Sequence, residues 1–173
     1  MVETVGEVII IHTEKLLTNL DELTEHHEML ISISKSKTEQ IKSGDMDNFS
    51  KLLMQERKQL QAIVQSETKR QELVNQVFNE IGIGQKDKTV SELMNHITNK
   101  EEQKRLDEAV TKLANSIIEL KQTEQLNNEL IQQSMQFVQL SLDMLQPSAQ
   151  SINYTNKTVK QERIKQSVFD SKA

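Results

Sequence analysis

The sequence predicts an all-α fold, an elongated antiparallel coiled-coil bundle of three long helices and one short helix with a flexible C-terminal tail. Composition is the first observation, because the 173 residues include four glycines, one proline and no tryptophan. Few helix breakers beside many Gln, Glu, Lys and Leu residues are typical of long helices. Apolar residues also recur every three or four positions over long stretches. Finally, three of the four glycines, Gly44, Gly82 and Gly84, fall where this pattern stops.

The first two helices are expected at residues 3–43 and 47–81, on either side of the segment around Gly44. Asp45 or Asp47 is placed to cap the first turn of the second helix, because a carboxylate accepts hydrogen bonds from the free backbone N–H groups there. Each helix has an apolar seam at spacings of three and four. Polar residues interrupt the two seams at His27, Ser34, Lys37, Glu56, Glu67 and Arg70.

Two capping boxes mark the starts of the remaining helices. The sequence "TVSE", beginning at Thr89, opens a short helix at about residues 90–97, and "TNKE", beginning at Thr98, opens a last helix at about 99–146. Pro147 ends the last helix, because its ring cannot continue the hydrogen-bonding pattern. The connections are short, so neighbouring helices are expected to be antiparallel.

The helices divide the chain into one bundle domain, residues 1–146, and a tail, residues 147–173. The net charge of the chain is −5, and an acidic body argues against nucleic-acid binding. The tail contains five basic and two acidic side chains, which make a weak electrostatic patch at most.

The sequence lacks the residues and motifs that several kinds of catalysis and ligand binding require. There is no cysteine for disulfides or thiolate chemistry, no glycine loop for phosphates and no nucleophile elbow. We therefore expect no catalytic residue, no cofactor, no metal and no small-molecule substrate. The first residues do not resemble a signal peptide, and no apolar run is long enough to span a membrane, so a cytoplasmic location is expected.

Two polar groupings need an interpretation. In "EHHE", residues 25–28, adjacent side chains on a helix point about 100° apart and do not converge, so we interpret His26 and His27 as a solvated or partly packed pair rather than metal ligands. Glu67 and Arg70 are three residues apart on one helix. We interpret them as an intrahelical ion pair or as a register-setting contact between helices, not as catalytic residues.

The last helix carries two apolar stripes within residues 128–147, where Glu129 and Asp143 are the only ionisable side chains. One stripe continues the core seam that passes through Leu113 and Leu120, and its members are Ile131, Met135, Val138, Leu142 and Leu145. A second stripe lies about 120° away on a wheel of about 100° per residue, and its members are Leu126, Leu130, Phe137, Leu140 and Met144. The same angle meets only polar residues upstream, so the second stripe is confined to the end of the helix.

Two explanations of the second stripe remain open. In one, the first helix packs on it and the region is the centre of the bundle. In the other, the last helix extends past its neighbours and the stripe receives an amphipathic segment of a partner. Five such side chains are costly to leave in water, at about 1.5–3 kcal/mol each if fully buried. The stripe is therefore expected to be covered by one of the two.

Two blocks of the sequence resemble the FlgN family of flagellar type III export chaperones. In residues 30–73 the resemblance consists of the break at "GD" (44–45), Glu56 followed by Leu60, and Glu67 followed by Arg70. In residues 124–154 it consists of an Asn- and Leu-rich stretch, the closing "LQP" and the tyrosine that follows. The ending "SVFDSKA" also resembles that of Gram-positive members. The short helix region at 83–99 matches no motif of the family.

The resemblance implies a binding protein of long antiparallel helices without catalytic activity. Its partners would be the hook–filament junction proteins FlgK and FlgL and the export gate protein FlhA, a membrane protein, so association with the membrane would be indirect. Tyr154 would contact the gate. The cargo would bind through the apolar residues of the last helix: Leu126, Leu130, Ile131, Met135, Phe137, Val138, Leu140, Leu142, Met144 and Leu145. The alternative is a structural coiled-coil adaptor or homodimerising scaffold without an export role.

Overall fold

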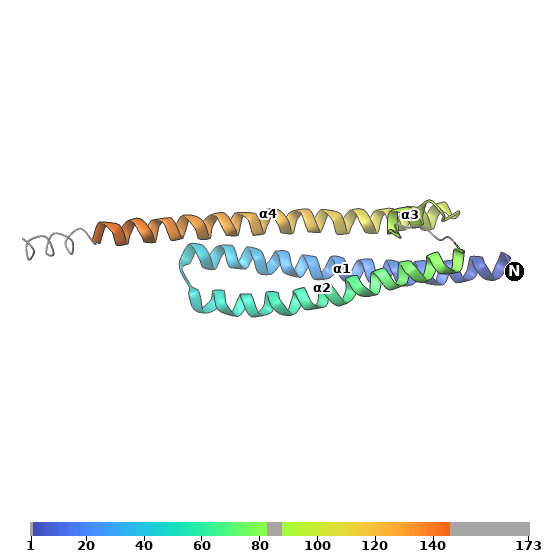
Figure 1. Cartoon of the computed structure of the whole chain (residues 1–173), viewed down its shortest axis with the longest axis horizontal. Coiled ribbons are helices and arrows are strands. Elements are labelled where there is room, and N and C mark those ends of the chain that lie inside the picture. The colour runs from blue at the N-terminus through green and yellow to red at the C-terminus, as the bar shows by residue number, and fades with distance from the viewer. Residues whose placement is uncertain (1, 83–87, 146–173) are drawn as a thin grey trace, which may run out of the picture. The chain divides into compact units, whose positions relative to one another are not determined.

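The computed structural model describes residues 2–82 and 88–145, with the side chains of 2–11 and Ile81 left out (Figure 1). All regular structure in these ranges is helical, which confirms the predicted all-α class. The helices are α1 (Val2–Ser43), α2 (Met46–Ile81), α3 (Val90–Met94) and α4 (Lys100–Leu145). The predicted short helix was expected to continue to 97 and ends at Met94 instead. The predicted tail, 147–173, and its Tyr154 lie outside the described residues.

The helix ends follow from local chemistry. Gly44 has φ of 72°, a conformation that costs glycine little, and it lets the chain reverse between α1 and α2. Asp45 then caps α2 by accepting a hydrogen bond of 3.0 Å from the Asn48 backbone N–H. Gly82, also with φ of 72°, ends α2 in the left-handed conformation typical of a helix C-terminus. Thr89 caps α3 through the Glu92 N–H at 3.1 Å.

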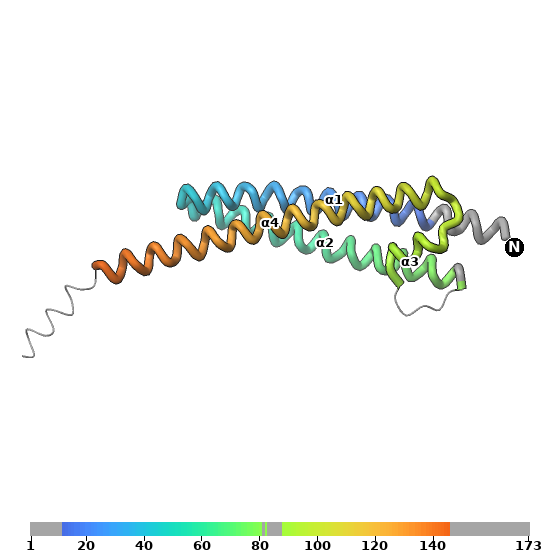
Figure 2. The backbone as a smooth tube through the Cα atoms, turned by 90° about the horizontal axis from the view of Figure 1, so that it is seen from above, coloured from blue at the N-terminus to red at the C-terminus, as the bar shows by residue number. Residues whose placement is uncertain are grey.

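The chain divides into two compact units, Met1–Leu130 and Ile131–Ala173. Within the first unit, α1 and α2 run side by side in opposite directions (Figure 2). Asn19 of α1 donates to the Ser66 carbonyl of α2 (3.2 Å), whereas Lys37, further along α1, bonds Glu56, earlier on α2 (2.6 Å). Contacts at higher residue numbers on α1 thus involve lower residue numbers on α2, as in an antiparallel helix pair.

The part of α4 that belongs to the first unit runs parallel to α1. Glu14 near the start of α1 pairs with Arg105 near the start of α4. Further along both helices, Lys37 pairs with Glu124 at 2.9 Å. Residue numbers thus increase in the same direction along α1 and α4, opposite to α2.

The apolar core of the first unit lies at one end. It combines the first half of α1, the second half of α2, α3 and the start of α4. Phe78, Leu93 and Leu106 are fully buried there, and the Phe78 ring contacts the His96 ring edge-on with centroids 6.3 Å apart. The buried members of this cluster are Leu16, Leu17, Leu20, Leu73, Val74, Val77, Phe78, Val90, Leu93, Ile97 and Leu106.

The other half of the first unit buries several polar side chains beside the apolar Leu30 and Ile31. At this level α1 contributes buried Ser34, Lys37 and Thr38. The predicted seam of α2 is wrong here, because Leu53 and Leu60 are 43% and 49% exposed. Thr38 and the ion pair of Lys37 with Glu56 lie between the helices at this level, whereas the two leucines are exposed.

Candidate functional site

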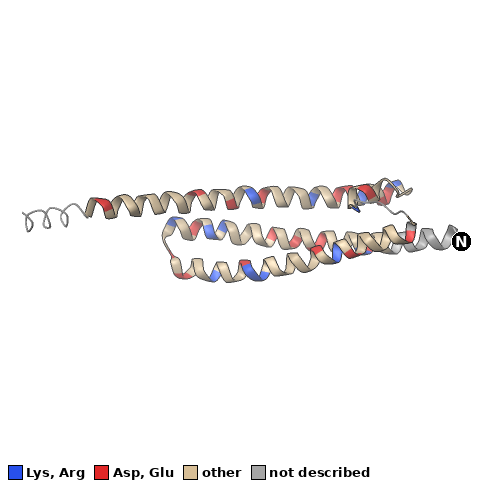
Figure 3. Ribbon diagram, in the orientation of Figure 1, with Lys and Arg blue, Asp and Glu red and all other residues tan. Residues whose placement is uncertain are grey.

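Exposed apolar side chains dominate α4 from residue 126 to its end. Phe137, the largest of them, is 72% exposed. Figure 3 shows charged residues along the rest of the helices and few in this stretch, where Asp143 is the only ionisable residue after Leu130. Leu130 and Ile131 are partly buried. The exposed members are Leu126, Met135, Phe137, Val138, Leu140, Leu142, Met144 and Leu145.

Exposure of both stripes corrects one expectation. Val138 and Leu145 were predicted to continue the core seam, but they are 55% and 75% exposed. Asn127 is the last residue of α4 that is buried, within the described part of the chain. It bonds Thr38, and α1 ends at Ser43, five residues after Thr38, whereas α4 ends at Leu145, eighteen residues after Asn127. Beyond this contact α4 therefore continues for thirteen residues more than α1 does, and its apolar residues keep their spacing of three and four.

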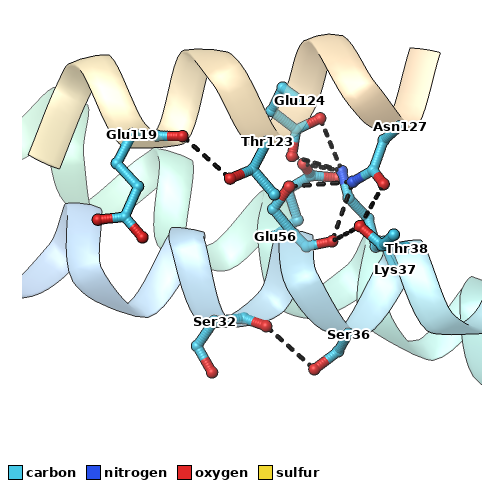
Figure 4. Close-up of polar contacts among 10 residues, drawn as sticks. Ser32, Ser36, Lys37, Thr38, Glu56, Glu119, Thr123, Glu124 and Asn127 are labelled. Atoms are coloured by element: carbon cyan, nitrogen blue, oxygen red, sulfur yellow. Dashed lines mark hydrogen bonds and ion pairs between the residues drawn. The ribbon is translucent and has the colours of Figure 1, made fainter. Parts of the chain in front are cut away.

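An ion-pair cluster joins all three long helices just before this apolar stretch (Figure 4). The ammonium group of Lys37, on α1, donates to Glu56 on α2 at 2.6 Å and contacts Glu124 on α4 at 2.9 Å. Lys37 is only 5% exposed, while the two carboxylates reach the surface in part. Burial alone would lower the pKa of Lys37, but the hydrogen bonds to Glu56 and Glu124 outweigh it and raise this pKa above its ordinary value.

A second, uncharged set of bonds lies beside the ion pairs. The Asn127 amide donates to the carbonyl and the hydroxyl oxygen of Ser34, at 2.9 and 3.0 Å, and its oxygen lies 2.6 Å from the Thr38 hydroxyl, which donates to it (Figure 4). Asn127 is 2% exposed, so each of these bonds replaces a bond to water. We call the six residues of the two sets the polar layer: Ser34, Lys37, Thr38, Glu56, Glu124 and Asn127.

The polar layer is expected to fix the axial position of α4 against α1. Apolar side chains pack almost equally well after a shift of one turn, whereas a buried amide or ammonium loses its partners. Ser34, Lys37 and Glu56 were recognised in the sequence as polar residues in apolar seams. That they meet Glu124 and Asn127 was not predicted, because Thr38 and Asn127 are 89 residues apart.

The two histidines of the "EHHE" segment have protein partners. His27 Nδ1 lies 2.7 Å from the Leu23 carbonyl and His26 Nδ1 lies 2.6 Å from the Gln59 amide nitrogen. No three His, Cys, Asp or Glu side chains gather as metal ligands within residues 2–82 and 88–145.

Glu67 and Arg70 form an ion pair along α2, with two bonds of 2.6 and 2.8 Å. The two bonds to Arg70 hold the pKa of Glu67 below its ordinary value. Of the two contacts expected for this pair, the structure has the one within the helix.

Fold and surface together define a protein whose described residues are helical and whose α4 ends in exposed apolar residues. The family model described as FlgN protein matches residues 1–162. The chain therefore belongs to the FlgN family, the family of flagellar export chaperones, and the resemblance of its two sequence blocks is confirmed. A related protein, "Uncharacterized protein YvyG" of Bacillus subtilis (strain 168), is 31% identical over 161 residues, which cover 91% of this chain and 97% of that one. No solved structure matches the chain.

Membership of the FlgN family supports general statements about function. The FlgN family is a family of chaperones and not of enzymes, and it implies binding to flagellar hook-associated proteins in general. In the part of the chain that the structure describes, every helix is too short or too polar to cross a membrane.

Proposed function

We propose that this protein is a cytoplasmic export chaperone for FlgK and FlgL, the hook–filament junction proteins. It binds their aggregation-prone terminal segments, prevents premature assembly and delivers them to the export gate. The observation that carries the proposal is the exposure of the apolar residues of α4 between Leu126 and Leu145. No membrane-crossing helix occurs in the described ranges, and FlhA would provide the only association with the membrane, an indirect one.

The chemistry of this surface fits a disordered amphipathic partner. Segments that fold on binding supply apolar residues at spacings of three and four, which pack on an apolar helix face. Met135 and Met144 are unbranched and adaptable, so the surface can accept more than one cargo sequence. The cargo must later be released, and an affinity of about 1 µM, equivalent to about 8 kcal/mol, is compatible with release.

Calorimetry with purified FlgK-type and FlgL-type cargo tests the cargo site. We expect the double variant Phe137→Ala/Leu140→Ala to bind at least about tenfold more weakly, because both side chains would be buried by the cargo. The matched control is Met54→Ala/Ile118→Ala, which removes two side chains of similar exposure, 63% and 54%, on α2 and α4. Unchanged affinity in a folded Phe137→Ala/Leu140→Ala variant would rule out this site.

Tyr154 is proposed to contact FlhA, and its support is the resemblance of the segment around it to the family. The Tyr154→Ala variant is expected to bind cargo like the unaltered chain and to lose binding to the cytoplasmic part of FlhA. If the variant still binds FlhA and supports export, the assignment of Tyr154 is wrong.

The second candidate is a homodimerising scaffold, which the same exposed residues favour because a second copy could cover them. Light scattering of the chain with and without cargo separates the two functions. A tight homodimer that ignores cargo would favour the scaffold, and a complex formed with cargo would favour the chaperone.

A further inference from the structure

A second exposed apolar surface runs along the first half of α2. Its residues lie within about 20° of one line on the helix, at about 100° per residue, and span roughly 27 Å. All four are exposed, and Val64 is the most exposed at 65%. We call this set the α2 stripe: Met46, Leu53, Leu60 and Val64.

In the second half of α2, residues at equivalent heptad positions are buried. Val74 follows Leu60 by two heptads, and Phe78 follows Val64 by two heptads. Both Val74 and Phe78 are buried in the apolar cluster that includes residues of α3. One line of the helix is thus packed at its far end and faces solvent at its near end, although its side chains are apolar in both places.

An unpaired cation lies in the middle of the α2 stripe. Arg57 is between Leu53 and Leu60 and about 40° from their line, and it is exposed. No hydrogen bond or ion pair holds it among the described residues, and no residue three or four positions away on α2 is acidic. An antiparallel pairing of two stripes would bring the two Arg57 side chains to within about one helical turn of each other. Charge complementarity therefore disfavours a second copy and favours a partner with an acidic residue.

We propose that the α2 stripe and Arg57 together bind an amphipathic helix of an export cargo, one that presents an Asp or Glu to Arg57. The inference rests on the proposed function for the class of partner and uses a surface separate from the apolar end of α4. The cargo helix would cover the stripe with apolar residues at spacings of three and four, and its carboxylate would pair with the free guanidinium.

Calorimetry with full-length protein and FlgK-type and FlgL-type cargo tests the proposal. The test variants are Val64→Ser and Arg57→Glu, because both side chains are exposed and their replacement leaves the core intact. The matched controls are Met54→Ser, at 63% exposure, and Lys58→Glu, which point away from the stripe. We expect each test variant to weaken the binding of at least one cargo about five- to tenfold, and each control less than about twofold.

The outcomes separate this proposal from the proposed function. If Val64→Ser and Arg57→Glu bind both cargoes normally while Phe137→Ala/Leu140→Ala does not, the α2 stripe is not a cargo surface and the chaperone function stands. If the α2 variants weaken binding and the α4 variant does not, the stripe is the cargo surface and the α4 site is wrong. If the unaltered chain binds neither cargo, both proposals fail. A dimer that Val64→Ser or Arg57→Glu dissociates in light scattering would assign the stripe to a second copy and overturn the proposal.

Discussion

The two halves of the unit formed by residues 1–130 hold the same long helices together in different ways. At one end, Phe78, Leu93 and Leu106 are fully buried among other apolar side chains. At the other, the polar layer places Lys37 and Asn127 between the helices. Apolar contacts are non-directional and supply most of the free energy of folding, whereas buried polar contacts are directional and supply little net free energy. The apolar end is therefore expected to determine stability, and the polar layer the register of α4.

The same substitution at the two ends gives the largest expected difference. Phe78→Ala should lower the free energy of unfolding by about 3–5 kcal/mol, because it opens a cavity among fully buried neighbours. Phe49→Ala, in the half of α2 that faces the polar layer, should cost roughly 1–2 kcal/mol since Phe49 is only partly buried. Urea unfolding followed by circular dichroism measures both. Equal losses would contradict a stability concentrated at the apolar end.

Removing the ammonium group from the polar layer should have the next largest effect. Lys37→Met leaves Glu56 and Glu124 without their shared cation, and we expect a loss of about 1–3 kcal/mol, below that of a fully buried pair because both carboxylates reach water. The control is Lys35→Met, which breaks the exposed pair with Glu119 and should cost less than about 1 kcal/mol. A similar loss in the two variants would mean that the ion pairs of Lys37 contribute no more to stability than an exposed ion pair does.

A variant that replaces the charges by apolar residues tests register directly. Lys37→Leu/Glu56→Leu/Glu124→Leu is expected to be as stable as the unaltered chain or more so, because no charge is left unpaired. Its helices should nevertheless shift more easily. The chain has no cysteine, so pairs of cysteines introduced along α1 and α4 can report register by cross-linking. If one cross-linking register persists in the triple variant, the ion pairs do not set it.

The amide in the polar layer is expected to have a smaller effect. Asn127→Ala removes the amide that bonds Ser34 and Thr38 and should lower the free energy of unfolding by about 1–2 kcal/mol. Asn128→Ala, one residue further along α4 and exposed, should change it by less than about 0.5 kcal/mol. The same unfolding measurement applies, and the expectation fails if both variants unfold alike.

The smallest expected effect is a dependence of stability on pH. The pKa of Lys37 is raised above its ordinary value of 10.5, so the stabilisation from its charge is complete below pH 10.5 and is lost as the pH rises through the folded-state pKa. The unaltered chain should therefore lose more stability above pH 10.5 than Lys37→Met does. Parallel slopes for the two proteins in alkaline unfolding would show that Lys37 keeps its proton equally in both states.

Local signals in the sequence predicted the elements better than their contacts. Gly44, Asp45, Gly82 and Thr89 lie at helix ends in the structure, because capping and left-handed turns depend on a few adjacent residues. The exposure of Leu53 and Leu60 was not predicted, and periodicity alone placed Val138 and Leu145 in the core seam although the family resemblance placed them on the cargo surface. A period of three and four residues shows which side chains share a face, but it does not show whether another helix lies opposite that face.

The candidate site, too, could be predicted from the sequence only in part. The stripe through Phe137, Leu140 and Met144 could be predicted, because apolar residues on two sides of one helix are visible in the sequence. The polar layer could not be assembled, because Lys37, Glu56 and Asn127 come from three helices and meet only once the register is known. Arg57 likewise became a candidate only because the structure shows no partner for it within the described residues.

The exposed methionines of α4 have a consequence for redox chemistry. Met135 and Met144 are 67% and 79% exposed, and the chain has no cysteine to react first with an oxidant. Oxidation converts a methionine thioether into a polar sulfoxide, which disrupts apolar interfaces and is reversed by dedicated reductases. Oxidants would therefore place two polar groups on the proposed cargo surface, and cargo loading would depend on the cell's capacity to repair methionine.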